Sequence, residues 1–247
     1  MSQKTHEPFI PAIRSNIIES TSIASVFDHI DHHETLVIFD IDNTILESIN
    51  EQGSPQWVTA LIKHAEEIGM NPEQAYTIIE PILLDVFMKT EVKPVEPEIV
   101  SLIAQLQQKN ISVIGLTARS TLMVDPTVKH LASIAISLHQ TSLALENALE
   151  IAHLPAPHEA HYHEGVLYCG GVNPKGRTLE TLLKSTSYMP EKIIFVDDQL
   201  RYLTSVETVA AELKIPFIGI HYTRLDEKVK KFVLDQASII RCFTSNP

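Results

Sequence analysis

The sequence contains only two cysteines, Cys169 and Cys242, and they lie far apart in the chain. Two such residues do not form a disulfide framework or a zinc ribbon, and their scarcity is typical of a reducing compartment. The 247 residues, 44% of them hydrophobic, can bury a large core without a covalent staple. We therefore expect one domain with an insertion, or one large and one small domain.

Basic residues are also scarce, since 19 lysines and arginines stand against 31 acidic residues, for a formal net charge of −12. An acidic chain repels phosphate backbones, so nucleic acid is not expected as a general partner. A local positive pocket can still hold a single phosphate.

Long apolar runs are absent, and none approaches the roughly 18 residues needed to cross a bilayer. The N-terminus has no basic region followed by an apolar stretch, so no Sec-type signal peptide is expected. The prediction is a soluble protein without a membrane span, cytoplasmic by default. Export by a specialised secretion system would leave no sign of this kind, and the sequence indicates no oligomeric state.

Apolar runs of strand length alternate with patterns of helical period. We expect strands at 36–39, 111–116, 136–138, 192–196 and 216–220, and a hairpin at 162–169. Helices are expected at 23–30, 54–92, 99–106, 125–132, 175–183, 203–213 and 229–233. Within 54–92, Ser54-Pro55 and Asn71-Pro72 predict two helix starts, and Pro81 should break or restart the second helix.

This alternation predicts an α/β fold with a parallel sheet and helices on both faces. Three predicted strands end in polar residues, at Asp40, at Thr117 and at the pair Asp197-Asp198. Ligands of such sheets bind at the carboxyl ends of the strands, so we expect a site there.

Asp40, Asp42 and the pair Asp197-Asp198 would then bring several carboxylates into a small space. Two carboxylates about 4 Å apart repel by about 4 kcal/mol at an effective dielectric constant near 20. The fold must protonate one of them or bind a cation, and hard oxygen ligands favour Mg²⁺ over Zn²⁺. With Lys175 and Thr117 added, the set suits phosphoryl transfer.

Four segments, in order, resemble the motifs of the haloacid dehalogenase (HAD) superfamily of phosphohydrolases. They are residues 37–44 (VIFDIDNT), residues 113–119 (VIGLTAR), Lys175 before Gly176, and residues 193–198 (IIFVDD). The resemblance covers about residues 35–222. Looser features, including residues 128–131 and 165–168, resemble a smaller, little-characterised HAD-like branch with members in intracellular bacteria. The second motif is also similar to acid phosphatases of the superfamily.

The resemblance implies a Rossmann-like three-layer α/β/α core, at 1–46 and 96–247, with a small helical cap at 47–95 that sets substrate choice. A second excursion, at about 140–170, would line the entrance.

The family's roles transfer residue by residue. Asp40 would attack phosphorus, form an aspartyl phosphate and bind Mg²⁺. Asp42 would act as general acid and base and bind the metal through its carbonyl. Thr117 and Lys175 would hold phosphoryl oxygens, and Asp198 would bind the metal directly, with Asp197 binding directly or through water. Arg119 would either contact the substrate phosphate or cap a neighbouring element.

The implied activity is hydrolysis of a phosphomonoester, on a small molecule or a phosphoprotein. HAD transport ATPases usually carry Thr at the place of Asp42, and dehalogenases lack an acid there, so Asp42 indicates a phosphatase or a phosphomutase. A phosphomutase or phosphotransferase, and a scaffold that binds phospho-ligands without turnover, are the alternatives. One departure is Tyr202, where many relatives have another acid.

A histidine cluster stands apart from the four motifs. Its spacing matches no standard zinc pattern, so loop histidines in solvent are the default expectation and a zinc site the alternative. Its members are His153, His158, His161 and His163, near Glu159 and Glu164.

Overall fold

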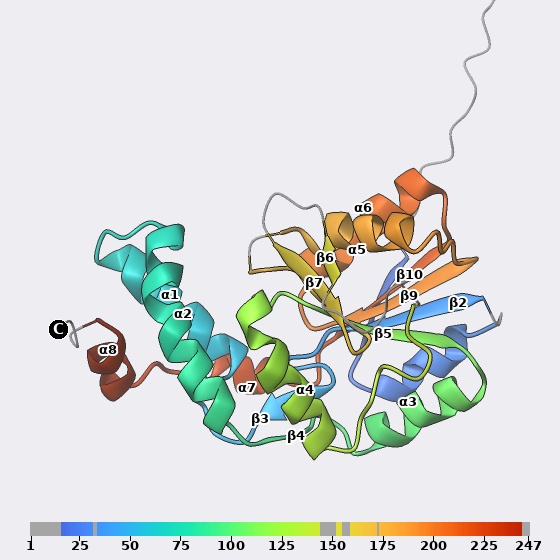
Figure 1. Ribbon diagram of the computed structural model, residues 1–247. Coiled ribbons are helices and arrows are strands. Elements are labelled where there is room, and N and C mark those ends of the chain that lie inside the picture. Colours follow the sequence, from blue (N-terminus) through green and yellow to red (C-terminus); the bar gives the residue numbers. More distant parts are fainter. Residues whose placement is uncertain (1–15, 32–33, 144–151, 155–158, 172, 244–247) are drawn as a thin grey trace, which may run out of the picture.

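The computed structural model describes residues 16–31, 34–143, 152–154, 159–171 and 173–243 (Figure 1). Its main feature is an eight-stranded sheet. The strands run, from one edge to the other, in the order β1 (Ile17–Ser20), β10 (Phe217–Tyr222), β9 (Lys192–Asp197), β2 (Thr35–Phe39), β5 (Ser112–Thr117), β8 (Val166–Tyr168), β7 (Ala160–His163) and β6 (Ala152–Leu154).

Neighbouring strands are parallel from β1 to β8, and only the last two pairs, β8–β7 and β7–β6, are antiparallel. The predicted mostly parallel α/β fold is therefore confirmed. The strand β2 lies in the middle, and all five of its residues are buried, because helices cover both faces of the sheet.

Alternate residues of β2 belong to two different cores. Leu36 and Ile38 pack beneath α5 (Lys175–Ser185) and α6 (Leu200–Leu213). Val37 and Phe39 face the layer formed by η1 (Ile23–His29), α3 (Glu98–Gln108) and α4 (Val124–Ser133). Figure 1 shows these helices on opposite faces of the sheet. The result is a three-layer Rossmann-like arrangement.

A pair of helices stands beside the carboxyl ends of the strands. They are α1 (Pro55–Glu67) and α2 (Pro72–Lys89), capped at their starts by Ser54 and Asn71 as predicted. A short antiparallel pair, β3 (Leu46–Ser48) and β4 (Val92–Pro94), joins them to the sheet. Their buried faces form a third core around Trp57, Leu61 and Ile79.

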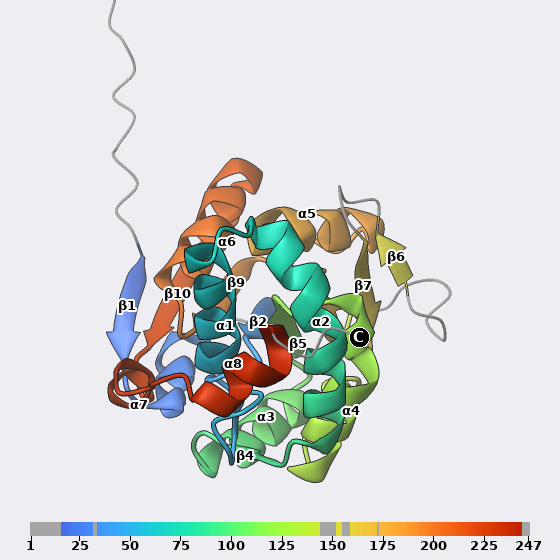
Figure 2. The ribbon, with the colours of Figure 1, turned by 90° about the vertical axis from the view of Figure 1, so that its left-hand side faces the viewer.

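The chain after β10 leaves the sheet and joins this helical pair. It forms α7 (Asp226–Lys230) and α8 (Gln236–Phe243), and Figure 2 shows α8 lying across α1 and α2. The indole Nε1 of Trp57 donates to Ser238 Oγ at 2.9 Å, and both side chains are buried. In addition, Arg241 of α8 forms an ion pair with Asp85 of α2, with Nη2 2.7 Å from Oδ2.

We predict that Ser238→Ala lowers the free energy of unfolding by about 1–3 kcal/mol, because it leaves the buried Trp57 N–H without its acceptor. Urea denaturation measures this change. The matched control is Ser101→Ala, since the hydroxyl of Ser101 is exposed and only donates to the Glu98 carbonyl within its own helix. A loss in Ser238→Ala no larger than in this control would contradict the predicted role of the indole hydrogen bond.

Two predicted elements are wrong, and a third has other bounds. The helix α2 runs through Pro81 without a break, because packing of the helix into the third core outweighs one missing N–H donor. Residues 136–138 form no strand, and Ile136 and Leu138 instead pack as an irregular segment into the core below the sheet. The tail is helical as predicted, but the helix expected at 229–233 has other bounds, because α7 ends at Lys230, α8 begins at Gln236 and residues 232–235 have no regular secondary structure.

Candidate active site

Polar residues from three adjacent strands meet at one edge of the sheet. Asp40 follows β2, and its N–H donates to the Val196 carbonyl of β9 at 2.9 Å. Asp197 is the last residue of β9 and Thr117 the last of β5. Because β9, β2 and β5 are neighbours, the carboxyl ends of these strands lie side by side.

A buried lysine joins two of the carboxylates. Lys175 is the first residue of α5, and its Nζ lies 2.5 Å from Asp40 Oδ1 and 2.7 Å from Asp197 Oδ2. The ammonium also lies 4.3 Å from the ring centroid of Tyr202. Burial alone would lower the pKa of Lys175, but Asp197 and Asp40 raise it above its ordinary value. The lysine is therefore charged at neutral pH.

The position of Lys175 depends on the next residue, Gly176. A Cβ at Gly176 would lie 2.1 Å from the Ser205 carbonyl oxygen of α6, which is an impossible contact. Glycine lets the start of α5 approach α6 closely, and its N–H donates to Ser205 Oγ at 3.0 Å. The Lys-Gly pair thus fixes where the ammonium enters the site.

Asp198 is held by two amides. Its Oδ2 accepts from Asn43 Nδ2 at 3.3 Å and from Gln199 Nε2 at 3.0 Å. Asn43 has φ 57°, in the left-handed region that Asn tolerates better than most residues, and it lies in the loop directly after β2. The same Asn43 amide donates to Gln56 of α1 at 3.4 Å.

The carboxylates repel one another. Asp40, Asp197 and Asp198 offer oxygens that all lie within 4.8 Å of one another. Burial, and also the charges of Asp197 and Asp198, raise the pKa of Asp40 well above its usual value, although Lys175 lowers it. Burial and the charge of Asp197 raise the pKa of Asp198 to about 6. A hard divalent cation would relieve this repulsion, so the oxygen donors present fit Mg²⁺.

Asp42 does not join this group but forms an ion pair with Arg119. The guanidinium Nε lies 2.8 Å from Asp42 Oδ2, and Nη2 lies 2.8 Å from Oδ1, so both carboxylate oxygens are engaged. The backbone N–H of Arg119 also donates to Thr117 Oγ1 at 3.1 Å. Arg119 therefore lies within the site, and it links the end of β5 to the loop after β2.

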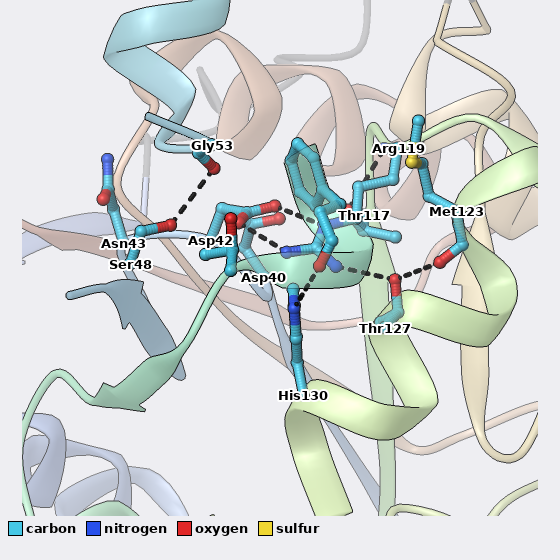
Figure 3. Close-up of polar contacts among 12 residues, drawn as sticks. Asp40, Asp42, Asn43, Ser48, Gly53, Thr117, Arg119, Met123, Thr127 and His130 are labelled. Atoms are coloured by element: carbon cyan, nitrogen blue, oxygen red, sulfur yellow. Dashed lines mark hydrogen bonds and ion pairs between the residues drawn. The ribbon is translucent and has the colours of Figure 1, made fainter. Parts of the chain in front are cut away.

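Three further residues hold the guanidinium in place. Its Nη1 donates to Thr127 Oγ1 of α4 at 2.7 Å, as Figure 3 shows. The ring centroid of Phe87, from α2, lies 4.7 Å from the guanidinium carbon. His130 Nε2 lies 2.9 Å from the Phe87 carbonyl oxygen. Burial would lower the pKa of Arg119, but Asp42 raises it, so the guanidinium stays charged.

The histidine beside this arginine gives a pH-dependent prediction. Burial, and then the charge of Arg119, lower the pKa of His130 to about 4. The unfolded chain, with an ordinary histidine pKa near 6.5, binds a proton that the folded protein does not between these values. The stability due to neutral His130 is therefore complete above about pH 6.5 and is lost as the pH falls toward 4.

We expect the free energy of unfolding of the wild type to fall, relative to His130→Gln, by on the order of 2 kcal/mol between pH 7 and pH 4. Other titrating groups are shared by both proteins and cancel in the difference. His139→Gln, at an exposed histidine, should follow the wild type throughout. Parallel curves for wild type and His130→Gln would show that His130 is not kept neutral by the fold.

A cavity of about 630 Å³ opens beside these groups. Of the residues predicted for the site, Asp40, Asp42, Thr117, Arg119 and Asp198 line it. Lys175 and Asp197 are fully buried and lie behind Asp40 rather than in the wall. The helical pair and the C-terminal segment supply much of the remaining wall.

The histidine cluster is only partly described. His158 lies outside the described residues, and of His153 only the backbone, in β6, is described. His161 is buried in β7 with its Nε2 3.0 Å from Glu159 Oε1. Among the described residues, the three aspartates are the only group of metal-ligating side chains that lie close enough together to share an ion, and no histidine belongs to it.

Sequence reasoning missed several residues that hold the site together. Asn43 and Gln199 orient Asp198, and Thr127 and Phe87 support Arg119. The sequence did contain a signal for Asn43. An asparagine that follows a strand and an Asp-x-Asp pattern is suited to a turn with left-handed backbone conformation. Gln199 directly follows Asp198 but belongs to none of the four motifs, and the contacts of Thr127 and Phe87 with Arg119 depend on tertiary packing.

Fold and site define an α/β protein with a mostly parallel sheet and an acidic, lysine-bridged cluster at its carboxyl edge. The chain belongs to the family described as "Protein of unknown function (DUF2608)", which it matches over residues 19–243.

Two relatives carry the name "Putative outer membrane protein". One, from Chlamydia trachomatis serovar D, is 25% identical over 218 residues, which cover 87% of this chain and 80% of the relative. The other, from Chlamydia pneumoniae, is 24% identical over 192 residues, which cover 78% of this chain and 70% of the relative. In the described part of this chain, no helix is both long and apolar enough to cross a membrane.

Solved structures give weaker similarities. A haloacid dehalogenase-like family hydrolase from Streptococcus pneumoniae is 13% identical with a TM-score of 0.46, over 85% of this chain and 90% of that one. A phosphoserine phosphohydrolase-like protein from Francisella tularensis is 13% identical with a TM-score of 0.35, over 85% and 99%. Both TM-scores lie below 0.5.

Proposed function

We propose that this protein is a magnesium-dependent phosphomonoesterase of the HAD type. The observation that carries the proposal is the buried Asp40–Lys175–Asp197 bridge, with Asp198 beside it, at the carboxyl end of the central strand. A fold keeps several repelling carboxylates together at a cost in stability, and such strain is commonly associated with function. Substrates would be phosphorylated small molecules or phosphoproteins.

Asp40, Asp198 and the Asp42 backbone carbonyl would hold the metal. Asp197 is less suited to direct ligation, because its Oδ2 accepts from Lys175 and its Oδ1 accepts from the Gln199 N–H at 2.7 Å. When bound, Mg²⁺ would neutralise the carboxylates and the negative charge of the phosphoryl group.

Asp40 would act as the nucleophile. It lies at the end of a buried strand, it lines the cavity, and Lys175 fixes one of its oxygens, so its position is rigid as an attacking group requires. An oxygen of Asp40 would form a bond to phosphorus while the bond to the leaving oxygen breaks. Water would then attack the aspartyl phosphate, release inorganic phosphate and restore Asp40. Thr117, which lines the cavity, would hold phosphoryl oxygens, whereas Lys175, buried behind Asp40, would hold the attacking carboxylate in place.

Asp42, once it has taken up a proton from solvent or from the substrate phosphate, would deliver that proton to the leaving oxygen and then, as a carboxylate, accept a proton of the attacking water. Its ion pair with Arg119 bears on this role, because both carboxylate oxygens are engaged before any substrate arrives. We propose that the substrate phosphate competes for Arg119, as a guanidinium binds phosphate in the same two-pronged manner. Asp42 would then be free to take part in proton transfer.

The ion pair is also the observation that favours the rival function, a module that binds phospho-ligands without turnover. If Arg119 never leaves Asp42, the general acid and base is blocked. A phosphomutase or phosphotransferase would use the same Asp40 chemistry and differ only in the final acceptor.

The helical segment at 47–95, which stands over the site, would act as the cap that sets substrate choice.

The test is hydrolysis of a panel of phosphomonoesters with and without Mg²⁺. We expect phosphate release with Mg²⁺, its loss after exhaustive chelation, and its return when Mg²⁺ is added back. Full activity after chelation would contradict the metal requirement. Tight phosphate binding without release from any ester would favour the binding module, and transfer to an alcohol without net hydrolysis would favour the phosphotransferase.

A further inference from the structure

The cavity beside Asp40 has two unlike walls. The wall formed by the sheet edge is polar and charged, and includes Asp40, Asp42 and Asp198. The opposite wall comes from α1, α2 and the C-terminal segment. It is largely apolar and includes Val58, Ile62 and Leu83. The groups proposed to hold the phosphate, Thr117 and Arg119, lie on the first wall, so the second wall faces the rest of the substrate.

Aromatic rings are concentrated in this cavity. Tyr76 and Phe87 come from α2, Tyr202 comes from α6, and Phe232 comes from the segment between α7 and α8. Binding of an apolar group against apolar side chains is favourable because it removes both surfaces from water. An aromatic ligand gains additional binding energy when its ring packs against an aromatic side chain. Thr59 and Lys63, polar residues of α1 that also line the cavity, are exposed. Because these two side chains are exposed, hydrogen bonds from a polyhydroxyl leaving group to them would gain little over the hydrogen bonds that the group already makes with water.

The cavity volume of about 630 Å³ lies in the range of sites for small organic ligands. It is large for a phosphate and a three-carbon alcohol, and it accommodates a phosphate with one or two rings. Its outer edge carries Lys63 and Arg201, both exposed cations on an otherwise acidic chain. These charges attract an anionic ester toward the opening.

We infer that the substrate is a small phosphomonoester whose leaving group carries an aromatic ring, and that this ring binds against Ile62 of α1 and Phe232 of the C-terminal segment. This inference rests on the proposed phosphatase function and adds the substrate class. It also assigns the C-terminal segment a part in selectivity, although that segment contributes to none of the four motifs.

Binding can be tested without turnover. The probes are 3-phenylpropylphosphonate and 3,4-dihydroxybutylphosphonate, whose carbon–phosphorus bonds resist hydrolysis. Isothermal titration of the full chain with Mg²⁺ should give an affinity about 10–100-fold higher for the phenyl compound, the value expected for burying one ring. Equal affinities, or a preference for the dihydroxy compound, would overturn the inference even if the protein hydrolyses phosphate esters.

Turnover separates this inference from the proposed function. The esters 2-phenylethyl phosphate and glycerol 3-phosphate both release alkoxide leaving groups, so an aromatic preference would not reflect a better leaving group. We expect kcat/KM about 10–100-fold higher for the phenyl ester. If neither ester is hydrolysed, the phosphatase proposal fails, while the phosphonate affinities still show whether the cavity binds an aromatic ligand.

Substitutions in the cavity wall test where the phenyl ring of the ligand binds. Ile62→Asn and Phe232→Ser should each lower the affinity ratio of the phenyl to the dihydroxy phosphonate by about 10-fold. Ile78→Asn, on the exposed outer side of α2, should leave the ratio unchanged and controls for the helical pair. A ratio that stays at the wild-type value in both cavity variants would place the ring elsewhere and overturn the inference.

Discussion

Asp40→Asn should lower phosphatase turnover by at least about 10³-fold and leave the fold intact. The amide has almost the same volume as the carboxylate but cannot attack phosphorus or bring a negative charge to the metal. The pKa of Asp40 is raised by burial, so its ionised form costs stability at neutral pH. The variant should therefore be as stable as the wild type, or more stable, in the absence of metal.

Turnover and urea denaturation of the same preparations check both halves of this prediction. The control Asp28→Asn makes the same chemical change at an exposed position of η1 and should behave as the wild type. A variant at position 40 with near-normal turnover would remove Asp40 from the mechanism. A variant that is inactive because it is unfolded would show instead that Asp40 is a structural residue.

Lys175→Met should be the most destabilising single change in the site. It leaves Asp40 and Asp197 buried without their shared cation, and the removal of one partner from a buried ion pair typically costs about 3–5 kcal/mol. Without Lys175 the pKa values of both aspartates should rise further. The loss in the free energy of unfolding should therefore shrink as the pH falls and the carboxyls take up protons.

Urea denaturation between pH 5 and pH 8 measures this loss. Lys184→Met, in the same helix, removes a lysine whose ion pair with Glu180 is exposed to solvent and should cost less than about 1 kcal/mol. Adding Asp40→Asn to Lys175→Met should recover part of the lost stability, because one of the two unpaired charges is gone. If the double variant is no more stable than Lys175→Met alone, the lysine acts through packing rather than charge.

Much of the fold could be predicted because its signals are local. The uninterrupted apolar run before Asp40 predicted a strand buried on both faces, and β2 has that environment. Ser54-Pro55 and Asn71-Pro72 predicted two helix starts because both the cap and the proline act within one turn. The meeting of Asp40, Thr117 and Asp197 followed from a general property of parallel sheets.

The elements that were predicted wrongly depend on distant contacts. Pro81 breaks an isolated helix, but the packing of α2 keeps this helix continuous through it. The apolar residues Ile136 and Leu138 are buried as expected, yet β5 already pairs with β8, so they join no strand. The packing of α8 on the helical pair involves residues 181 positions apart, Trp57 and Ser238, which no short pattern reveals.

The candidate site shows the same division. The residue types were readable from four motifs, but the partnership of Arg119 with Asp42 was not, since the sequence left Arg119 between a phosphate contact and a structural cap. Its geometry depends on Thr127 and on Phe87, which come from two different helices. Whether Arg119 then turns to the substrate phosphate stays a prediction.

The most direct test of the central claim is chemical trapping of the phosphoryl group during turnover. The wild-type protein is mixed with a hydrolysed phosphomonoester and Mg²⁺, quenched rapidly in acid, and reduced with borohydride, which converts an aspartyl phosphate to homoserine. Peptide mass spectrometry then locates the changed residue. The account predicts homoserine at position 40 and its absence without substrate. Homoserine at another aspartate, or rapid phosphate release with no trapped residue, would contradict it.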